Sequence, residues 1–421
     1  MSTAELSIAF FLQMFCILLA CRVVGMAARW IGQPQVVGEM IAGVLLGPSL
    51  LGLFLPDWQQ RLFPRDLTGV LYVGAQLGVG LYMFLVGVEF KTDLFRSRAR
   101  SAASVSIAGV AAPFVLGSLL ALWLTRVPGL FAGHIRLHEA MLFLGAAISI
   151  TAFPMLARII YERGLTGTSL GTLALAAGAI DDAVAWCVLA VVLASFGDGA
   201  MVAVVAIGGG LAYALFMLAV APRLLAPLGA AVEREGRLSP ALLGVVLMLF
   251  CLAAWAMDAV GIHAVFGGFL LGTAMPRGLL TRELTAKLEP FTVVFLLPMF
   301  FTYSGLRTRL DMVNTLELLG IAVVVLVASI TAKGVACWAA ARLNGEDNRT
   351  ALAVGTLMNS RGLMELIIIN IGLSKGIIQP ALFSILALMA IVTTLMASPL
   401  FELVYGRHAR RTGTLAQPPP A

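Results

Sequence analysis

Apolar stretches long enough to cross a lipid bilayer recur along the whole 421-residue chain and constrain its fold more than any other feature. A helix that crosses the hydrocarbon core needs about 20 mainly apolar residues. Hydrophobic residues make up 60% of the sequence and charged residues 12%, against about 25% charged in soluble domains. Lipid cannot hydrogen-bond backbone groups, so each run must satisfy its own N–H and C=O groups, as a helix does. The sequence therefore predicts an all-α, polytopic membrane protein.

We expect about 13 transmembrane helices within one membrane domain over residues 1–405. A first helix is followed by two six-helix inverted repeats, about 35–195 and 240–405, with a linker helix at 200–222. Residues 406–421 form a short Pro-rich tail that is expected to be disordered. The predicted spans are 6–24, 35–53, 68–90, 101–125, 138–158, 168–195, 200–222, 240–258, 260–275, 290–306, 316–341, 350–372 and 379–405.

Glycine-rich segments support the inverted repeat. Gly38 and Gly43 in VVGEMIAGVLLGP recur as Gly267 and Gly272 in VFGGFLLGTAMP. Small residues are also common where membrane helices pack closely, so chance matches between such segments are the alternative explanation. If the repeat holds, the fifth span is equivalent to the twelfth, and transporters with this symmetry bind their substrates near the middle of the membrane.

The fifth and twelfth spans both contain polar or helix-breaking residues near their centres. They read ISITAFPMLAR and GTLMNSRGLMEL, and the proline of the first removes a backbone donor. We predict two crossed discontinuous helices whose unwound carbonyls and hydroxyls coordinate a cation; for the fifth span the alternative is a Pro-kinked packing helix. The residues of this expected site are Ser149, Thr151, Pro154, Asn359 and Ser360.

Two adjacent carboxylates stand deep in the sixth span. Asp181 and Asp182 lie in LALAAGAIDDAVAWCVLAVV, where ionised groups are costly and generally functional. Neighbouring side chains on a helix point about 100° apart, so the two groups cannot serve one site equivalently. A buried carboxylate that holds either a proton or a cation can couple the two, and we expect Asp182 and Asp181 to bind Na⁺ or K⁺ and H⁺. A structural bridge between helices is the alternative.

Two basic residues also fall inside predicted spans. Lys333 in VLVASITAKGVACWAA must find a carboxylate, neutralise or reach the interface, and we hypothesise that it pairs with Asp181 when no ion is bound; a purely structural ammonium is the alternative. Arg361 and Glu365 are four residues apart on one helical face, which favours a structural charge pair near the site. Interfacial solvation is expected for the acidic residues nearer the span ends, Glu39, Glu89 and Asp258.

The basic residues also predict the orientation of the chain. They gather in alternate loops, for example at 91–100, 223–237 and 407–411, and Lys and Arg hold such loops in the cytoplasm. We therefore expect an inner-membrane protein with its N-terminus outside and its C-terminus in the cytoplasm. No nucleotide-binding fingerprint, nucleophile elbow or metal-ligand spacing is present. This predicts no enzyme activity, no cofactor, and no nucleic-acid or nucleotide partner; the lipid bilayer, monovalent cations and protons are the expected partners.

Six segments occur in an order that resembles the bacterial monovalent cation/proton antiporter superfamily, in the branch of the Kef-type potassium efflux systems and plant cation/proton exchangers. The resemblance implies the sodium/proton antiporter fold, a homodimer, and elevator-type alternating access. It also implies that Asp182 binds the ion, that Lys333 pairs with Asp181, and that transport is electrogenic. The segments are GQPQVVGEMIAGVLLGPSLLG, FLVGVEF, TAFPMLAR, GAIDDAVAW, FFTYSGLRT and MNSRGLMELIIINIGL.

These features predict exchange of Na⁺ or K⁺ for H⁺, with Li⁺ as a further transported ion and pH homeostasis as the role. Two other transport classes stay open. A gated cation channel would need a continuous polar path, whereas the sequence offers one compact carboxylate cluster. A sodium-coupled symporter of an organic solute would share the inverted-repeat architecture, and the adjacent aspartates with a membrane lysine favour proton exchange over it.

Overall fold

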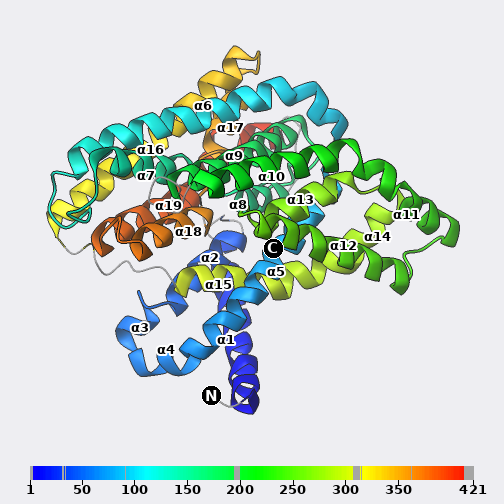
Figure 1. Ribbon diagram of the computed structural model, residues 1–421, viewed down its shortest axis with the longest axis horizontal. Coiled ribbons are helices and arrows are strands. Elements are labelled where there is room, and N and C mark those ends of the chain that lie inside the picture. Colours follow the sequence, from blue (N-terminus) through cyan, green and yellow to red (C-terminus); the bar gives the residue numbers. More distant parts are fainter. Residues whose placement is uncertain are drawn as a thin grey trace. The chain divides into compact units, whose positions relative to one another are not determined.

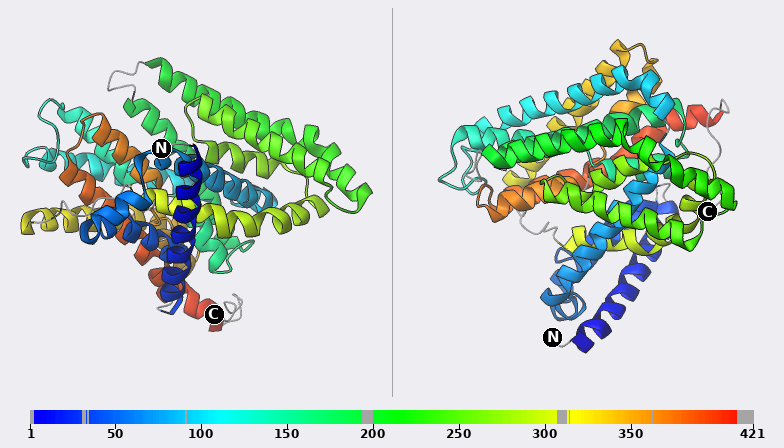
Figure 2. Two further views of the ribbon diagram at one scale, coloured as in Figure 1. Left: turned by 90° about the horizontal axis from the view of Figure 1, so that it is seen from below. Right: turned by 45° about the vertical axis from the view of Figure 1, so that its right-hand side comes forward.

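The computed structural model describes residues 3–30, 33, 35–90, 92–193, 200–306, 313, 315–361 and 363–411. These parts of the chain are helices joined by short loops, as the three views in Figures 1 and 2 show. The prediction of an all-α chain is thereby confirmed. Helical structure continues past the predicted boundary at residue 405, and the predicted tail from residue 412 on lies outside the described residues.

The helices are, in chain order, α1 (Thr3–Trp30), α2 (Gln35–Leu46), α3 (Leu51–Phe54), α4 (Pro56–Leu62), α5 (Arg65–Glu89), α6 (Thr92–Leu124), α7 (Leu137–Ser149), α8 (Phe153–Glu162), α9 (Ser169–Leu193), α10 (Ala200–Ala219), α11 (Ala221–Glu235), α12 (Pro240–Ala259), α13 (Ala264–Ala274), α14 (Leu279–Phe291), the π-helix η2 (Thr292–Leu296), α15 (Leu297–Leu306), α16 (Leu316–Leu343), α17 (Asn348–Leu357), α18 (Leu363–Ser374), α19 (Pro380–Phe401), the π-helix η3 (Glu402–Gly406) and α20 (Arg407–Arg411).

Nine of the helical segments in the described parts are long and apolar enough to cross a membrane. The count rises to ten if α10 and α11, which meet at a bend of 46°, form one span. The other three predicted spans fall on α9, on the short apolar helix α13, and on the pair α17 and α18. The total of 13 therefore stays a prediction.

The chain divides into two compact units, and the first combines residues 1–18, 62–92 and 193–303. Within this unit α5 packs along α13, and α13 also packs against α12 (Figures 1 and 2). Glycines make the first contact possible: a methyl group on Gly87 would clash with the carbonyl of Phe269, and one on Gly272 would clash with the carbonyl of Phe84. Close backbone approach at small residues is the usual way in which membrane helices pack.

The second unit combines residues 19–61, 93–192 and 304–421. It contains two places where a predicted span is broken: α7 ends at Ser149 before α8 begins at Phe153, and α17 ends at Leu357 before α18 begins at Leu363. The two breaks touch, because the backbone N–H of Ala152 donates to the carbonyl of Ser360 over 3.1 Å. The backbone is extended at Ile150 and Ala152 in the first break. Two interrupted helices therefore meet inside this unit.

Candidate functional site

The centre of the second unit is a pair of carboxylates on α9. Asp181 is fully buried and Asp182 is 1% exposed. The helix around them is apolar along its whole length, so its backbone hydrogen bonds are satisfied internally while these two side chains enter the protein interior. Ionised groups at such a position need partners, and the two residues differ in the partners that they have.

Asp181 accepts hydrogen bonds from three donors, two of them on helices and one in a helix break. The hydroxyl of Ser106 on α6 lies 2.7 Å from Oδ1. The hydroxyl of Thr151, in the break between α7 and α8, lies 2.7 Å from Oδ2. The ammonium of Lys333 on α16 lies 3.1 Å from the same oxygen. An ionised carboxylate with this many donors is well compensated in a low-dielectric interior.

Lys333 connects the carboxylate pair to the first helix break. Its side chain is fully buried, and its ammonium donates to the carbonyl oxygen of Ser149, the last residue of α7, as well as to Asp181. The carbonyls at the end of a helix have no intrahelical partner, so they are natural acceptors for a cation. The structure thus places Lys333 against Asp181, the partner that the sequence hypothesis names for it.

Asp182 differs from Asp181 in that its carboxylate lacks hydrogen-bond donors among the described residues. Neither of its carboxylate oxygens has a hydrogen-bond partner among the described residues, although the side chain is buried. A buried acceptor without a partner costs about 1–3 kcal/mol, and an ionised one costs more. A proton or a bound cation would relieve this cost, so Asp182 has the chemistry of a group that takes up one or the other.

The predicted residues of the first helix break differ in whether they contact the carboxylate pair. The single hydroxyl hydrogen of Thr151 is within reach of two acceptors, Oδ2 of Asp181 at 2.7 Å and the carbonyl of Met358 in the second break at 3.2 Å, and the shorter contact is the one to Asp181. The hydroxyl of Ser149 turns back to its own helix, where it bonds the carbonyl of Ala146. Pro154 stands in the first turn of α8, a favoured proline position, so it begins a new helix and does not kink a continuous one.

In the second break, the amide of Asn359 donates to the carbonyl of Gly355 over 3.0 Å. Its Oδ1 and the hydroxyl of Ser360 are buried and have no hydrogen-bond partner in the described part of the chain. The structure brings these residues to the first break through the backbone contact at Ser360. It shows no hydrogen bond from either side chain to the carboxylate pair in the described region.

A second buried charge pair lies in the same unit. The guanidinium of Arg361 is 3.3 Å from Glu365, and both side chains are almost fully buried. The guanidinium also donates to the hydroxyl of Ser329 over 3.1 Å and, at 3.5 Å, to the carbonyl of Ala147 in α7. The pair ties the second break to α16 and α7, and its structural role stays a prediction.

The structure corrects one expectation from the sequence, that for Glu39, and adds one residue, Ser106. Glu39 was expected to be solvated at a span end, but it is 2% exposed and accepts a hydrogen bond from Gln35 over 2.9 Å, because α2 is covered by neighbours within its unit. Ser106 was missed altogether. A single serine in an apolar helix has no sequence signal that separates a site residue from a packing residue, and only the fold brings it to Asp181.

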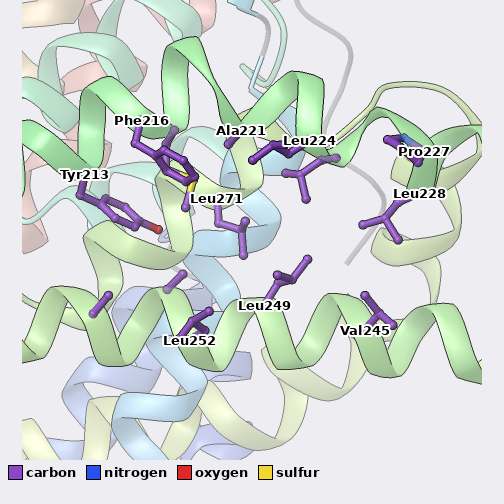
Figure 3. A pocket seen from close by; sticks show the side chains of 14 residues that line it. Tyr213, Phe216, Ala221, Leu224, Pro227, Leu228, Val245, Leu249, Leu252 and Leu271 are labelled. Atoms are coloured by element: carbon purple, nitrogen blue, oxygen red, sulfur yellow. The ribbon is translucent and has the colours of Figure 1, made fainter.

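A separate groove lies in the first unit and has a different character (Figure 3). It has a volume of about 560 Å³ and is lined by α10, α11, α12 and Leu271 of α13, almost entirely with apolar side chains. The tyrosine hydroxyl among them, that of Tyr213, is engaged with the carbonyl of Gly267 over 3.0 Å. None of the predicted site residues lines this groove, and its side chains offer no oxygen ligand for a cation apart from the engaged hydroxyl of Tyr213.

Comparison with known proteins settles the family of the chain. A family model described as "Sodium/hydrogen exchanger, transmembrane" matches residues 15–404. The chain belongs to this family. Its relatives are antiporters, in agreement with the resemblance that the sequence motifs indicate, and the chain is a multi-pass membrane protein of that class.

The chain matches different shares of the lengths of its individual relatives. The chain is 38% identical to the Na⁺/H⁺ antiporter NhaS4 of Synechocystis, over 91% of this chain and 94% of that protein. It is 32% identical to cation/H⁺ antiporter 19 of Arabidopsis thaliana and 31% identical to K⁺/H⁺ antiporter 1 of Saccharomyces cerevisiae, in each case over 94% of this chain. The chain spans about half the length of these two, 49% and 46% respectively.

A solved structure has a similar fold. The sodium proton antiporter MjNhaP1 from Methanocaldococcus jannaschii superimposes with a TM-score of 0.63, covering 97% of this chain and 99% of that one. The sequences are 13% identical, so the likeness concerns the fold alone. It agrees with the predicted sodium/proton antiporter fold.

Proposed function

We propose that this protein exchanges a monovalent cation, Na⁺ or K⁺, for H⁺ through one site centred on Asp182. The observation that carries the proposal is the state of this residue: it is buried, and neither carboxylate oxygen has a hydrogen-bond partner among the described residues. A carboxylate in that state is stabilised by a proton or by a cation, so the two compete for it. Competition at a single site, exposed alternately to the two sides of the membrane, produces exchange.

Asp181 and Lys333 have supporting roles in this scheme. In the proton-loaded form Asp182 is neutral and Lys333 pairs with Asp181, as their separation of 3.1 Å permits. When a cation binds Asp182, its positive charge competes with the ammonium for the neighbouring carboxylate, and Lys333 leaves Asp181. If Lys333 gives up its proton on leaving, two protons are exchanged for one cation, and transport is electrogenic.

The division of the chain supports an elevator-type mechanism. All residues assigned to the site belong to the second compact unit, and the first unit contains none of them. A unit that carries the complete site can expose it to either side by moving as a body, which leaves the buried contacts around Asp181 intact. From the alternation of basic loops we further propose an inner-membrane protein with the N-terminus outside and the C-terminus in the cytoplasm. The proposal that it is a homodimer rests on the family resemblance alone.

The experiment uses everted membrane vesicles from a strain that lacks its own antiporters. Respiration acidifies the vesicles, and a pH-sensitive dye reports proton efflux when NaCl, KCl or LiCl is added. The wild type should respond, Asp182→Asn should not, and the exposed Glu317→Gln should respond like the wild type. The order of the three salts identifies the transported ion.

Two outcomes would overturn the proposal. Full activity of Asp182→Asn would remove this residue from the transport cycle. A folded wild-type protein that moves no protons with any of the three salts would exclude cation/proton exchange, and uptake of an organic solute with Na⁺ would then be tested.

A further inference from the structure

Ser106 makes a contact with the carboxylate pair that the roles described above do not use. It is fully buried on α6 and donates its hydroxyl hydrogen to Oδ1 of Asp181 over 2.7 Å. The other two donors, Thr151 and Lys333, both bond Oδ2. Within the described part of the chain, Ser106 is therefore the one donor that holds the first oxygen of this carboxylate.

Gly109, one turn along α6 from Ser106, shows how closely this helix approaches the lysine. A methyl group on Gly109 would lie 2.7 Å from the sulfur of Cys337, and 3.9 Å from both Oδ2 of Asp181 and Cε of Lys333. Cys337 follows Lys333 by four residues on α16, so both side chains lie on the same helical face. The absence of a side chain at Gly109 lets α6 lie directly against the ion pair.

We propose that Ser106 is a positioning residue for the transported cation, because it fixes the orientation of Asp181 when Lys333 leaves. The inference rests on the proposed function, in which a cation at Asp182 displaces the lysine. Once the ammonium has gone, Thr151 still bonds Oδ2 and Ser106 still bonds Oδ1, so neither oxygen is free to turn. Gly109 leaves the room that this close approach of α6 requires.

A carboxylate of Asp181 that is already oriented should raise the affinity of the site for the cation. A cation that meets oxygen ligands already in position does not have to order them, and the entropic cost of ordering is subtracted from the binding free energy. Without Ser106 the Asp181 carboxylate can rotate about its last bond after Lys333 leaves, and the cation must restrain it. The alternative is that Ser106 only satisfies its own buried hydroxyl and contributes to folding.

These two roles give different kinetics in proteoliposomes that contain the purified protein. The positioning role predicts that Ser106→Ala raises KM for Na⁺ or K⁺ about tenfold, the scale of one hydrogen bond to a charged group, while Vmax per folded transporter stays near the wild-type value. Ser106→Thr retains the hydroxyl and should return KM to within about twofold of the wild type. A folding role lowers the amount of active protein and leaves KM unchanged.

The control and a second variant use the same helix. Ser118→Ala removes a hydroxyl of α6 that bonds the carbonyl of Met141 over 3.0 Å, away from the carboxylates, and should leave KM unchanged. Gly109→Ala should raise KM, because its methyl group displaces Cys337 and with it α16. Combining it with Cys337→Ala removes the sulfur that the methyl group meets, and KM should fall again.

Cation-induced stabilisation against heat, measured on the same variants in detergent, separates the two proposals. If the wild type exchanges ions and Ser106→Ala has the wild-type KM, the positioning role is wrong and the proposed function stands. If the wild type is stabilised by a cation without exchanging it, the proposed function fails. In that case the positioning role is supported if Ser106→Ala needs about tenfold more cation than the wild type for half-maximal stabilisation, and it is wrong if the two need the same concentration. A wild type with neither property overturns both.

Discussion

Replacing Lys333 by methionine should destabilise the protein by about 3 kcal/mol. The ammonium and the carboxylate of Asp181 have no exposed surface and lie 3.1 Å apart. Removal of one partner from a buried pair costs about 3–5 kcal/mol, because an uncompensated charge remains. The hydroxyls of Ser106 and Thr151 still bond Asp181, which favours the lower end of that range. At about 2–4 °C per kcal/mol for a large domain, the unfolding temperature should fall by roughly 6–12 °C.

A double-mutant cycle tests the reasoning by thermal unfolding of the purified protein in detergent. The cycle comprises the wild type, Lys333→Met, Asp181→Asn and the double variant. The double variant leaves no unpaired charge, so it should be more stable than Lys333→Met alone. Lys287→Met is the control, because the Lys287 side chain is 40% exposed in its pair with Glu283 and exposed ion pairs contribute about 0–1 kcal/mol. Additive losses in the double variant would refute the idea that the two charges compensate each other.

Two further predictions concern stability outside the site. Asp347 caps α17, and a hydrogen bond from the side chain of Thr350 is the main cause that lowers the pKa of Asp347 below its ordinary value of 3.8. The cap should stabilise the fold by about 1 kcal/mol above pH 3.8, and this stabilisation is lost as the pH falls through the lower pKa of the folded state. The stabilisation should be missing in Asp347→Ala. A pH series of unfolding temperatures with no difference between this variant and the wild type would contradict it. Gly272→Ala should cost about 1–3 kcal/mol, because its methyl group meets the backbone of α5, whereas Gly244→Ala in α12 meets nothing within 4 Å and should be neutral or slightly stabilising in the same unfolding assay.

The membrane fold could be predicted from the sequence because lipid leaves few alternatives to a helix. The breaks in two helices were also predictable, since Pro154 and the polar group around Asn359 interrupt otherwise apolar runs. The predicted number of spans rests on the lengths of the apolar runs. A short helix such as α13, with 11 residues, can be covered by protein on most of its surface, and its length then no longer indicates whether it crosses the bilayer.

The residues that we propose for the site stand out in the sequence where their burial is costly. Asp181, Asp182 and Lys333 carry charges that lipid or protein interior tolerates only with compensation, so each is conspicuous in an apolar run. A serine hydroxyl carries no such penalty, since it can bond a carbonyl of its own helix. Ser106 therefore looks like any other small residue until the packing of α6 against α9 places it beside a carboxylate.

The inequality between the two carboxylates explains why the chain has both. A bridge between helices requires one carboxylate, and Asp181 with its three donors already provides it. A second buried acid without a hydrogen-bond donor in the described structure lowers stability, by about 1–3 kcal/mol if neutral and by more if ionised. Such a cost is difficult to explain by folding, whereas a transport site requires a group that is left unsatisfied by the protein. In the proposed cycle, a cation bound at Asp182 would meet the negative charges of two adjacent carboxylates on the same helix, and Lys333 would neutralise Asp181 only until that cation arrives.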